Sequence, residues 1–185
     1  MSLELIVGCM YSGKSTELYK RVKRLQTIDQ TYIIYNSHFD QRYGSDGIYT
    51  HDNIHLQCQV SEYLLPKLNT DEFMRANEVF IEEAQFFKDL YEFVKLAVET
   101  FHKNVTVIGL DGDSSRQHFG QIHQLLPLCD KVTKLRALCS VCADGTPGIF
   151  SKKIAVEDKE QGKEQIDVGS ADKYIAVCRR CYVQS

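Results

Sequence analysis

The chain has 185 residues, which suits one ordinary domain or a compact domain with a small appendage. Hydrophobic residues make up 43% of it, so a buried core is expected and disorder throughout is excluded. The formal net charge of −3 does not favour a protein that binds nucleic acid over a basic face. No apolar run approaches the roughly 20 residues that span a bilayer, and the N-terminus lacks the basic region of a signal peptide. We therefore expect a cytoplasmic protein with neither a nucleic-acid nor a membrane partner.

Strand-like and helix-like segments alternate through the first two thirds of the chain. This alternation predicts a parallel sheet that is covered by helices on both faces. Apolar and β-branched runs predict strands, and apolar residues at helical spacing predict helices. The expected strands are residues 3–7, 32–35, 79–81, 105–110 and 131–135. One helix is expected to begin at residue 13, and another is expected to cover residues 90–101.

The composition changes after about Arg136, where Cys, Gly and Lys become frequent and long apolar runs end. The charged stretch 151–170 contains two glycines and is predicted to be a loop or a loose hairpin. We expect an α/β domain over residues 1–136 and a small metal-binding lobe over residues 137–185.

Residues 8–15 read G-C-M-Y-S-G-K-S and fit the phosphate-binding pattern G-x-x-x-x-G-K-[ST] at every fixed position. The motif lies between an expected buried strand and an expected helix, as such a loop requires. Lys14 would reach the β- and γ-phosphates, and the Ser15 hydroxyl would bind Mg²⁺. The expected loop residues are Gly8, Cys9, Met10, Tyr11, Ser12, Gly13, Lys14 and Ser15.

Two acidic residues, Glu82 and Glu83, end the apolar strand at 79–81. In phosphoryl transfer one acid can hold Mg²⁺ and another can take the proton of the attacking hydroxyl. Because side chains alternate along a strand, the two acids lie on opposite sides and need not share a role.

Seven cysteines without a signal peptide argue against a disulfide framework. Four of them form two Cys-x-x-Cys pairs, which supply the four thiolates of a closed tetrahedral zinc site. Unrelated free thiols or a redox pair are the alternatives. The expected zinc ligands are Cys139, Cys142, Cys178 and Cys181.

These motifs alone leave several functions open. A phosphate loop with a strand-end acid suits a nucleoside kinase, and it also suits a RecA-like ATPase that acts on nucleic acid. A regulatory GTPase is less favoured because no Asn-Lys-x-Asp motif is present. A non-catalytic zinc-binding adaptor would bind metal without turnover.

The ordered set of motifs resembles the thymidine kinase 1-like (type II) family. The resemblance implies a P-loop (RecA-like) α/β fold, and a zinc lobe whose lasso loop closes over the nucleoside. It also implies transfer of the γ-phosphate of ATP to the 5′-hydroxyl of thymidine, giving dTMP in pyrimidine deoxynucleoside salvage for DNA synthesis. The resemblance covers essentially the whole chain, through residues 8–18, 40–43, 50–52, 82–87, 110–112, 119–120 and 171–174.

The resemblance implies that Glu83 is the general base and that Arg42 stabilises charge on the transferring phosphoryl group. Ser15 and Glu82 would hold Mg²⁺, although Glu82 replaces the family's aspartate. The residues implied at the ATP site beside residues 8–15 are Asp40, Gln41, Arg42, Glu82, Glu83, Ala84 and Gln85.

The resemblance also implies a pocket around the thymine ring, in which Ser114 stands where relatives often carry an aromatic residue. The family is usually tetrameric, with a dimer as the alternative, and is inhibited by its end product, dTTP. The implied thymidine-binding residues are Met10, Phe86, Leu110, Ser114, Phe119 and Tyr174, with the lasso residues Gln165, Ile166, Asp167, Val168 and Gly169.

Overall fold

The computed structural model describes residues 1–39, 48–49, 55–154 and 173–184 of the chain. Its centre is a six-stranded sheet with the strand order β5-β2-β6-β7-β1-β8. Every pair of neighbouring strands is parallel, which confirms the predicted fold class. The strands are β1 (Ser2–Gly8), β2 (Tyr32–Ser37), β5 (Gln59–Ser61), β6 (Glu78–Glu82), β7 (Asn104–Gly109) and β8 (Lys131–Leu135).

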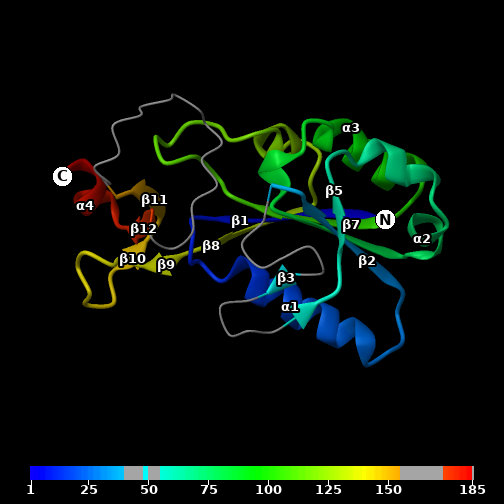
Figure 1. Ribbon diagram of the computed structural model, residues 1–185, viewed down its shortest axis with the longest axis horizontal. Coiled ribbons are helices and arrows are strands. Elements are labelled where there is room, and N and C mark those ends of the chain that lie inside the picture. Colours follow the sequence, from blue (N-terminus) through cyan, green and yellow to red (C-terminus); the bar gives the residue numbers. More distant parts are fainter. Residues whose placement is uncertain (40–47, 50–54, 155–172, 185) are drawn as a thin grey trace.

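Helices flank both faces of the sheet, with α1 on one side and α2 and α3 on the other (Figure 1). Among the described residues, no helix combines the length and the apolar character that crossing a membrane requires. The helices are α1 (Lys14–Gln26), α2 (Asp71–Arg75), α3 (Leu90–Lys95), the π-helix η3 (Leu96–Thr100) and the 3-10 turns η1 (Leu65–Asn69), η2 (Ala84–Phe86) and η4 (Ile122–Leu125).

The central strands are apolar on both faces because each face is covered by helices. In β1, Leu5 packs in the cluster on the α3 side of the sheet, whereas Ile6 packs with Leu18 and Val22 of α1. All four side chains are fully buried. Strands that are buried on both faces read as nearly continuous apolar runs, which is why the sequence reveals them.

Beyond β8 the chain forms a small unit at one end of the sheet (Figure 1). We call its described residues, 137–154 and 173–184, the C-terminal lobe. It contains two antiparallel strand pairs and a short helix. β9 (Ala137–Leu138) pairs with β10 (Pro147–Gly148), β11 (Phe150–Lys153) pairs with β12 (Tyr174–Val177), and α4 (Arg179–Val183) follows; elsewhere, β3 (Ile48–Tyr49) pairs with β4 (His55–Leu56).

Two predicted segments differ in detail from the structure. The helix expected over residues 90–101 is present, but its second half is a π-helix. The segment 151–170 begins as strand β11, and the antiparallel pairing of β11 with β12 agrees with a hairpin. Residues 155–170 of that segment lie outside the described residues.

A network of charged side chains joins α1 to the edge of the sheet. Arg21 of α1 donates to the two carboxylate oxygens of Glu4 in β1 at 2.7 and 2.8 Å. Lys131 Nζ of β8 lies 2.9 Å from Glu4 Oε1, and Thr133 Oγ1 donates to the same oxygen at 3.1 Å. The hydrogen bonds from Arg21 are the main reason that the pKa of the Glu4 carboxyl falls from 4.5 to about 2.

The Glu4 network gives a pH-dependent prediction. We expect Glu4→Gln to lower the free energy of unfolding at pH 7 by about 1–2 kcal/mol, because solvent screens part of this network. A lowered folded-state pKa stabilises the protein above the unfolded pKa, and this contribution fades as pH falls from 4.5 towards about 2. Urea unfolding should therefore show a smaller difference between variant and parent at pH 3 than at pH 7. The exposed Glu99→Gln is the control, and an equal loss at both pH values would contradict the network's role.

Candidate active site

The loop between β1 and α1 has the backbone shape that an anion-binding loop needs. Tyr11 and Gly13 have positive φ angles of 64° and 84°, and Ser12 N donates to Cys9 O at 3.4 Å. Gly13 is the N-cap of α1 and has no side chain to satisfy the amides of the first helical turn. Those amides and the positive end of the helix dipole suit a phosphate group.

Close packing also demands a glycine at the start of this loop. A Cβ atom on Gly8 would lie 2.6 Å from Leu135 O and 2.7 Å from Ser12 Oγ. Because real Cβ atoms do not approach so closely, a larger residue would displace the loop from the end of β8. Gly8 therefore sets where the loop leaves the sheet.

The first half of the loop rests on the C-terminal lobe. Met10 N donates to Ser151 Oγ of β11 at 2.9 Å, and Cys9 Sγ donates to Gly148 O of β10 at 3.4 Å. Cys9 and Ser151 are both buried, and burial raises the pKa of the Cys9 thiol. The lobe therefore fixes the backbone of the phosphate loop at two points. No sequence pattern points to a functional role for Ser151.

The second half of the loop faces the end of strand β6. Ser15 Oγ donates to Glu82 Oε1 at 2.5 Å, and Glu82 is 2% exposed. Phe80, two residues earlier, packs on α1, so alternation places Glu82 on the same face of the sheet. Lys14 is also buried, and its Nζ donates to Cys9 O at 2.9 Å. A hydroxyl and a carboxylate oxygen are hard donors, so their placement at the loop fits Mg²⁺.

Glu83 leaves the strand in a different direction. Its φ and ψ angles of 50° and 41° are left-handed, an uncommon conformation for a non-glycine residue, and they break the alternation after β6. Gln85 Nε2 donates to Glu83 Oε2 at 2.5 Å, and Gln85 Oε1 accepts from Leu110 N at 3.0 Å. Gln85 thus connects Glu83 to the end of β7. The resemblance implies an ATP contact for Gln85, and in the structure its side chain hydrogen-bonds the Glu83 carboxylate.

Aromatic side chains gather next to these carboxylates. The rings of Phe86 and Phe119 meet edge to face, with centroids 5.4 Å apart, and Phe39 lies 5.8 Å from Phe86 on centroids. Both Phe86 and Phe119 are half-buried. The structure therefore brings together two of the residues expected around the thymine ring, and it adds Phe39, which the sequence analysis missed.

The other expected thymidine-binding residues lie on three different elements. Leu110 directly follows β7, and Ser114 lies in the loop beyond it, where its carbonyl oxygen accepts a hydrogen bond from Tyr182. Met10 lies in the phosphate loop, and Tyr174 is the first residue of β12. Asp40, Gln41, Arg42 and residues 165–169 lie outside the described residues.

The four cysteines of the two Cys-x-x-Cys pairs form one cluster, with all sulfur atoms within 4.8 Å of one another. Cys142 Sγ lies 3.8 Å from Cys178 Sγ and 3.5 Å from Cys181 Sγ. Four zinc–sulfur bonds of about 2.3 Å in a tetrahedron would separate the sulfurs by about 3.8 Å, so the cluster fits zinc. The backbone N–H of Cys142 donates to Cys139 Sγ and is the main cause that lowers the pKa of Cys139 to about 6.

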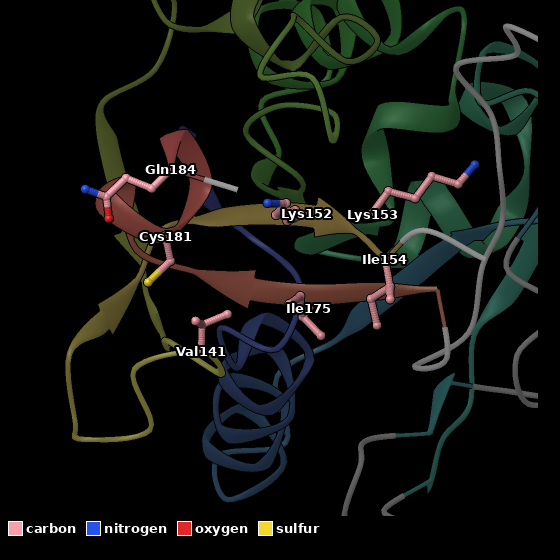
Figure 2. Close-up of a pocket in the computed structure, with 7 residues that line it drawn as sticks. All are labelled: Val141, Lys152, Lys153, Ile154, Ile175, Cys181 and Gln184. Carbon is pink, nitrogen blue, oxygen red and sulfur yellow. The ribbon is translucent and has the colours of Figure 1, made fainter. Parts of the chain in front are cut away.

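A separate apolar pocket of about 440 Å³ lies on the C-terminal lobe (Figure 2). Apart from Cys181, none of its lining residues belongs to the expected sites. The pocket is therefore distinct from the region between the phosphate loop and β6. It is lined by Val141, Lys152, Lys153, Ile154, Ile175, Cys181 and Gln184.

The parallel sheet, the glycine-rich loop before α1 and the carboxylates at the end of β6 define a P-loop nucleotide-binding protein. A protein-family model described as thymidine kinase matches residues 1–182. The chain belongs to the thymidine kinase family.

Individual relatives agree over nearly the whole chain. The thymidine kinase of fowlpox virus is 38% identical over 188 residues, covering 98% of this chain and 96% of the relative. The cytosolic thymidine kinase of Gallus gallus is 36% identical over 182 residues, covering 98% and 77%. Thymidine kinase a of Arabidopsis thaliana is 36% identical over 185 residues, covering 98% and 75%.

The cysteine cluster predicts about one zinc ion per chain in the purified protein. We expect Cys142→Ser to lower the zinc content, because three thiolates with a hydroxyl bind zinc more weakly than four thiolates. Chelation should increase hydrogen exchange in the C-terminal lobe before it does so in the parallel sheet. Cys129→Ser, outside the cluster, is the matched control and should keep its zinc. Metal analysis that finds none in the parent protein would contradict the assignment.

Proposed function

We propose that the protein transfers the γ-phosphate of ATP to the 5′-hydroxyl of thymidine. The observation that carries the proposal is the whole-chain match to the thymidine kinase family. The contact of the phosphate loop with the end of β6 supports it, because that contact places a donor site and a carboxylate pair side by side. The family match favours this reading over the RecA-like ATPase that the motifs alone left open.

In this proposal the donor phosphates bind at residues 8–15. The first-turn amides of α1 and the Lys14 ammonium neutralise phosphate charge, and Ser15 and Glu82 hold Mg²⁺. Bound Mg²⁺ would supply charge neutralisation on the β- and γ-phosphates. Asp40, Gln41 and Arg42 complete the donor site in the proposal, with Arg42 acting on the transferring phosphoryl group.

Glu83 is the proposed general base. Its carboxylate accepts the proton of the 5′-hydroxyl as the oxygen attacks phosphorus, so the proton leaves the alcohol and the γ-phosphate leaves ADP. The hydrogen bond from Gln85 holds one oxygen of Glu83, which orients the other. The left-handed backbone at Glu83 supports the assignment, since such conformations concentrate at functional sites.

The acceptor side of the proposal rests on the aromatic pair at residues 86 and 119. Aromatic rings offer a flat apolar wall for a pyrimidine ring. The remaining proposed contacts come from Met10, Leu110, Ser114 and Tyr174, together with the lasso residues 165–169.

Further features complete the proposal. Division into a kinase domain at residues 1–136 and a zinc lobe at 137–185 rests on the change of composition after Arg136, and cytoplasmic location rests on the sequence of the N-terminus. Assembly into a homotetramer and inhibition by dTTP rest on the family resemblance. The relative from Gallus gallus carries the word cytosolic in its name, which supports the location.

The direct test is ADP release measured with each of the four natural deoxynucleosides. We expect release to depend on thymidine and a phosphorylated nucleoside to form in equal amount, because the acceptor alcohol takes the phosphoryl group. ATP hydrolysis that ignores thymidine and responds to DNA or RNA would contradict the proposal and favour the ATPase.

Glu83→Gln tests the proposed base. We expect turnover to fall by about two to four orders of magnitude, since an amide cannot accept the proton, while ATP binding persists. Steady-state kinetics and a nucleotide-binding assay measure the two effects separately. Glu92→Gln, the same change at an exposed position on α3, is the control. Near-normal phosphorylation by the Glu83 variant would refute the assignment.

A further inference from the structure

A second connection joins the C-terminal lobe to the main domain, away from the phosphate loop. Tyr182 of α4 directly follows Cys181, and its hydroxyl donates to Ser114 O at 2.7 Å. Ser114 belongs to the loop at residues 110–121, which we call the β7 loop. In Figure 1 this loop extends from β7 towards α4. A residue next to the sulfur cluster therefore holds the backbone of a loop expected in the thymidine site.

Stacking reinforces this hydrogen bond. The guanidinium of Arg116, also in the β7 loop, lies 4.3 Å from the centroid of the Tyr182 ring and 5.6 Å from that of Phe150. The rings of Tyr182 and Phe150 are themselves 5.3 Å apart. Arginine over an aromatic face is an attractive arrangement. The tip of the β7 loop is thus attached to the lobe through both a hydrogen bond and a cation–π contact.

Hydrogen bonds within the β7 loop connect its residues, so a displacement of the loop's tip is transmitted to its C-terminal end. Asp113 Oδ1 accepts from Ser115 N at 2.9 Å and from Gln117 N at 2.8 Å. Asp113 N also donates to Gln117 O at 3.0 Å. Arg116 has a positive φ of 62°, which turns the chain between these bonds.

The C-terminal end of the loop packs against Gln85, the residue that hydrogen-bonds the proposed base Glu83. Gly120 has a φ of 60°, and a Cβ atom there would lie 2.1 Å from Gln85 O. Phe119, its neighbour, contacts Phe86 edge to face. Gln85 therefore contacts the β7 loop at both of its ends, at Leu110 and at Gly120, whereas Tyr182 holds its tip.

We propose that Tyr182 is a positioning residue for the nucleoside. Its hydroxyl and its ring set the position of the β7 loop, and the loop sets the wall formed by Phe119 and Ser114. The inference rests on the proposed function and deepens it, because it gives a role in thymidine binding to a residue that need not touch thymidine. The phosphate loop has a separate connection to the lobe, in which Met10 N donates to Ser151 Oγ, so Tyr182 and the phosphate loop do not share this contact.

Tyr182→Phe removes only the hydroxyl that bonds to the β7 loop. We expect the KM for thymidine to rise about 3- to 10-fold, as the loss of one hydrogen bond predicts. The KM for ATP and kcat should each change less than about 2-fold, because Tyr182 lies outside the donor site and the base. Tyr63→Phe, the same change at an exposed tyrosine, should leave all three values unchanged.

Two further measurements separate positioning from general damage. Hydrogen exchange at residues 113–119 should increase in the Tyr182 variant while the parallel sheet and the zinc content stay as in the parent protein. The effects of Tyr182→Ala and Arg116→Ala on thymidine KM should be strongly non-additive, since each removes the same stacked pair. Additive effects would overturn the shared role.

An unchanged KM for thymidine would overturn the inference, as would an equal rise in both KM values or a rise accompanied by loss of zinc. The unmodified enzyme in the same assay tests the proposed function separately. If it fails to phosphorylate thymidine at all, the proposed function fails and this inference falls with it. If it is active and Tyr182→Phe behaves like Tyr63→Phe, only the inference fails.

Discussion

The hydrogen bond between Ser15 Oγ and Glu82 Oε1 is the contact on which the rest of the site depends. It joins the first turn of α1 to the end of β6, two elements that are 67 residues apart in the chain. A parallel sheet makes this meeting possible, because the carboxyl ends of its strands share one edge and helix N-termini begin there. The order of β1 and β6 around β7 brings the phosphate loop and the carboxylates to that edge. The Glu83 side chain leaves the strand in a different direction from that of Glu82, because the backbone is left-handed at Glu83, directly after β6.

The C-terminal lobe contributes to the site through contacts as well as through its cysteines. One contact, from Ser151, fixes the backbone of the phosphate loop at Met10. Another, from Tyr182, fixes the β7 loop at Ser114. Ser151 lies in β11, which pairs with β12, and β12 leads directly to Cys178. Tyr182 directly follows Cys181. A structural metal at that cluster would therefore influence both substrate sites while lying outside them.

The sequence predicts the buried strands β1, β2, β6 and β7, because strands covered on both faces are nearly continuous apolar runs. It misses the edge strand β5, which is three residues long and has no fully buried residue. It also predicts the cysteine cluster, since paired Cys-x-x-Cys spacing has few other uses. It misses Ser151, Tyr182 and Arg116, whose partners lie far along the chain and carry no local pattern. The π-helical turn at residues 96–100 is also missed, since such turns are rare and occur mostly as single turns within α-helices.

The most direct test of the account is a crystal structure with thymidine, Mg²⁺ and a non-hydrolysable ATP analogue. The account predicts that a Glu83 oxygen lies within about 2.6–3.2 Å of the nucleoside's 5′-oxygen, with the analogue's phosphates on the amides of residues 8–15. A Glu83 carboxylate turned away from the sugar, with the pyrimidine outside the aromatic pair at residues 86 and 119, would contradict it.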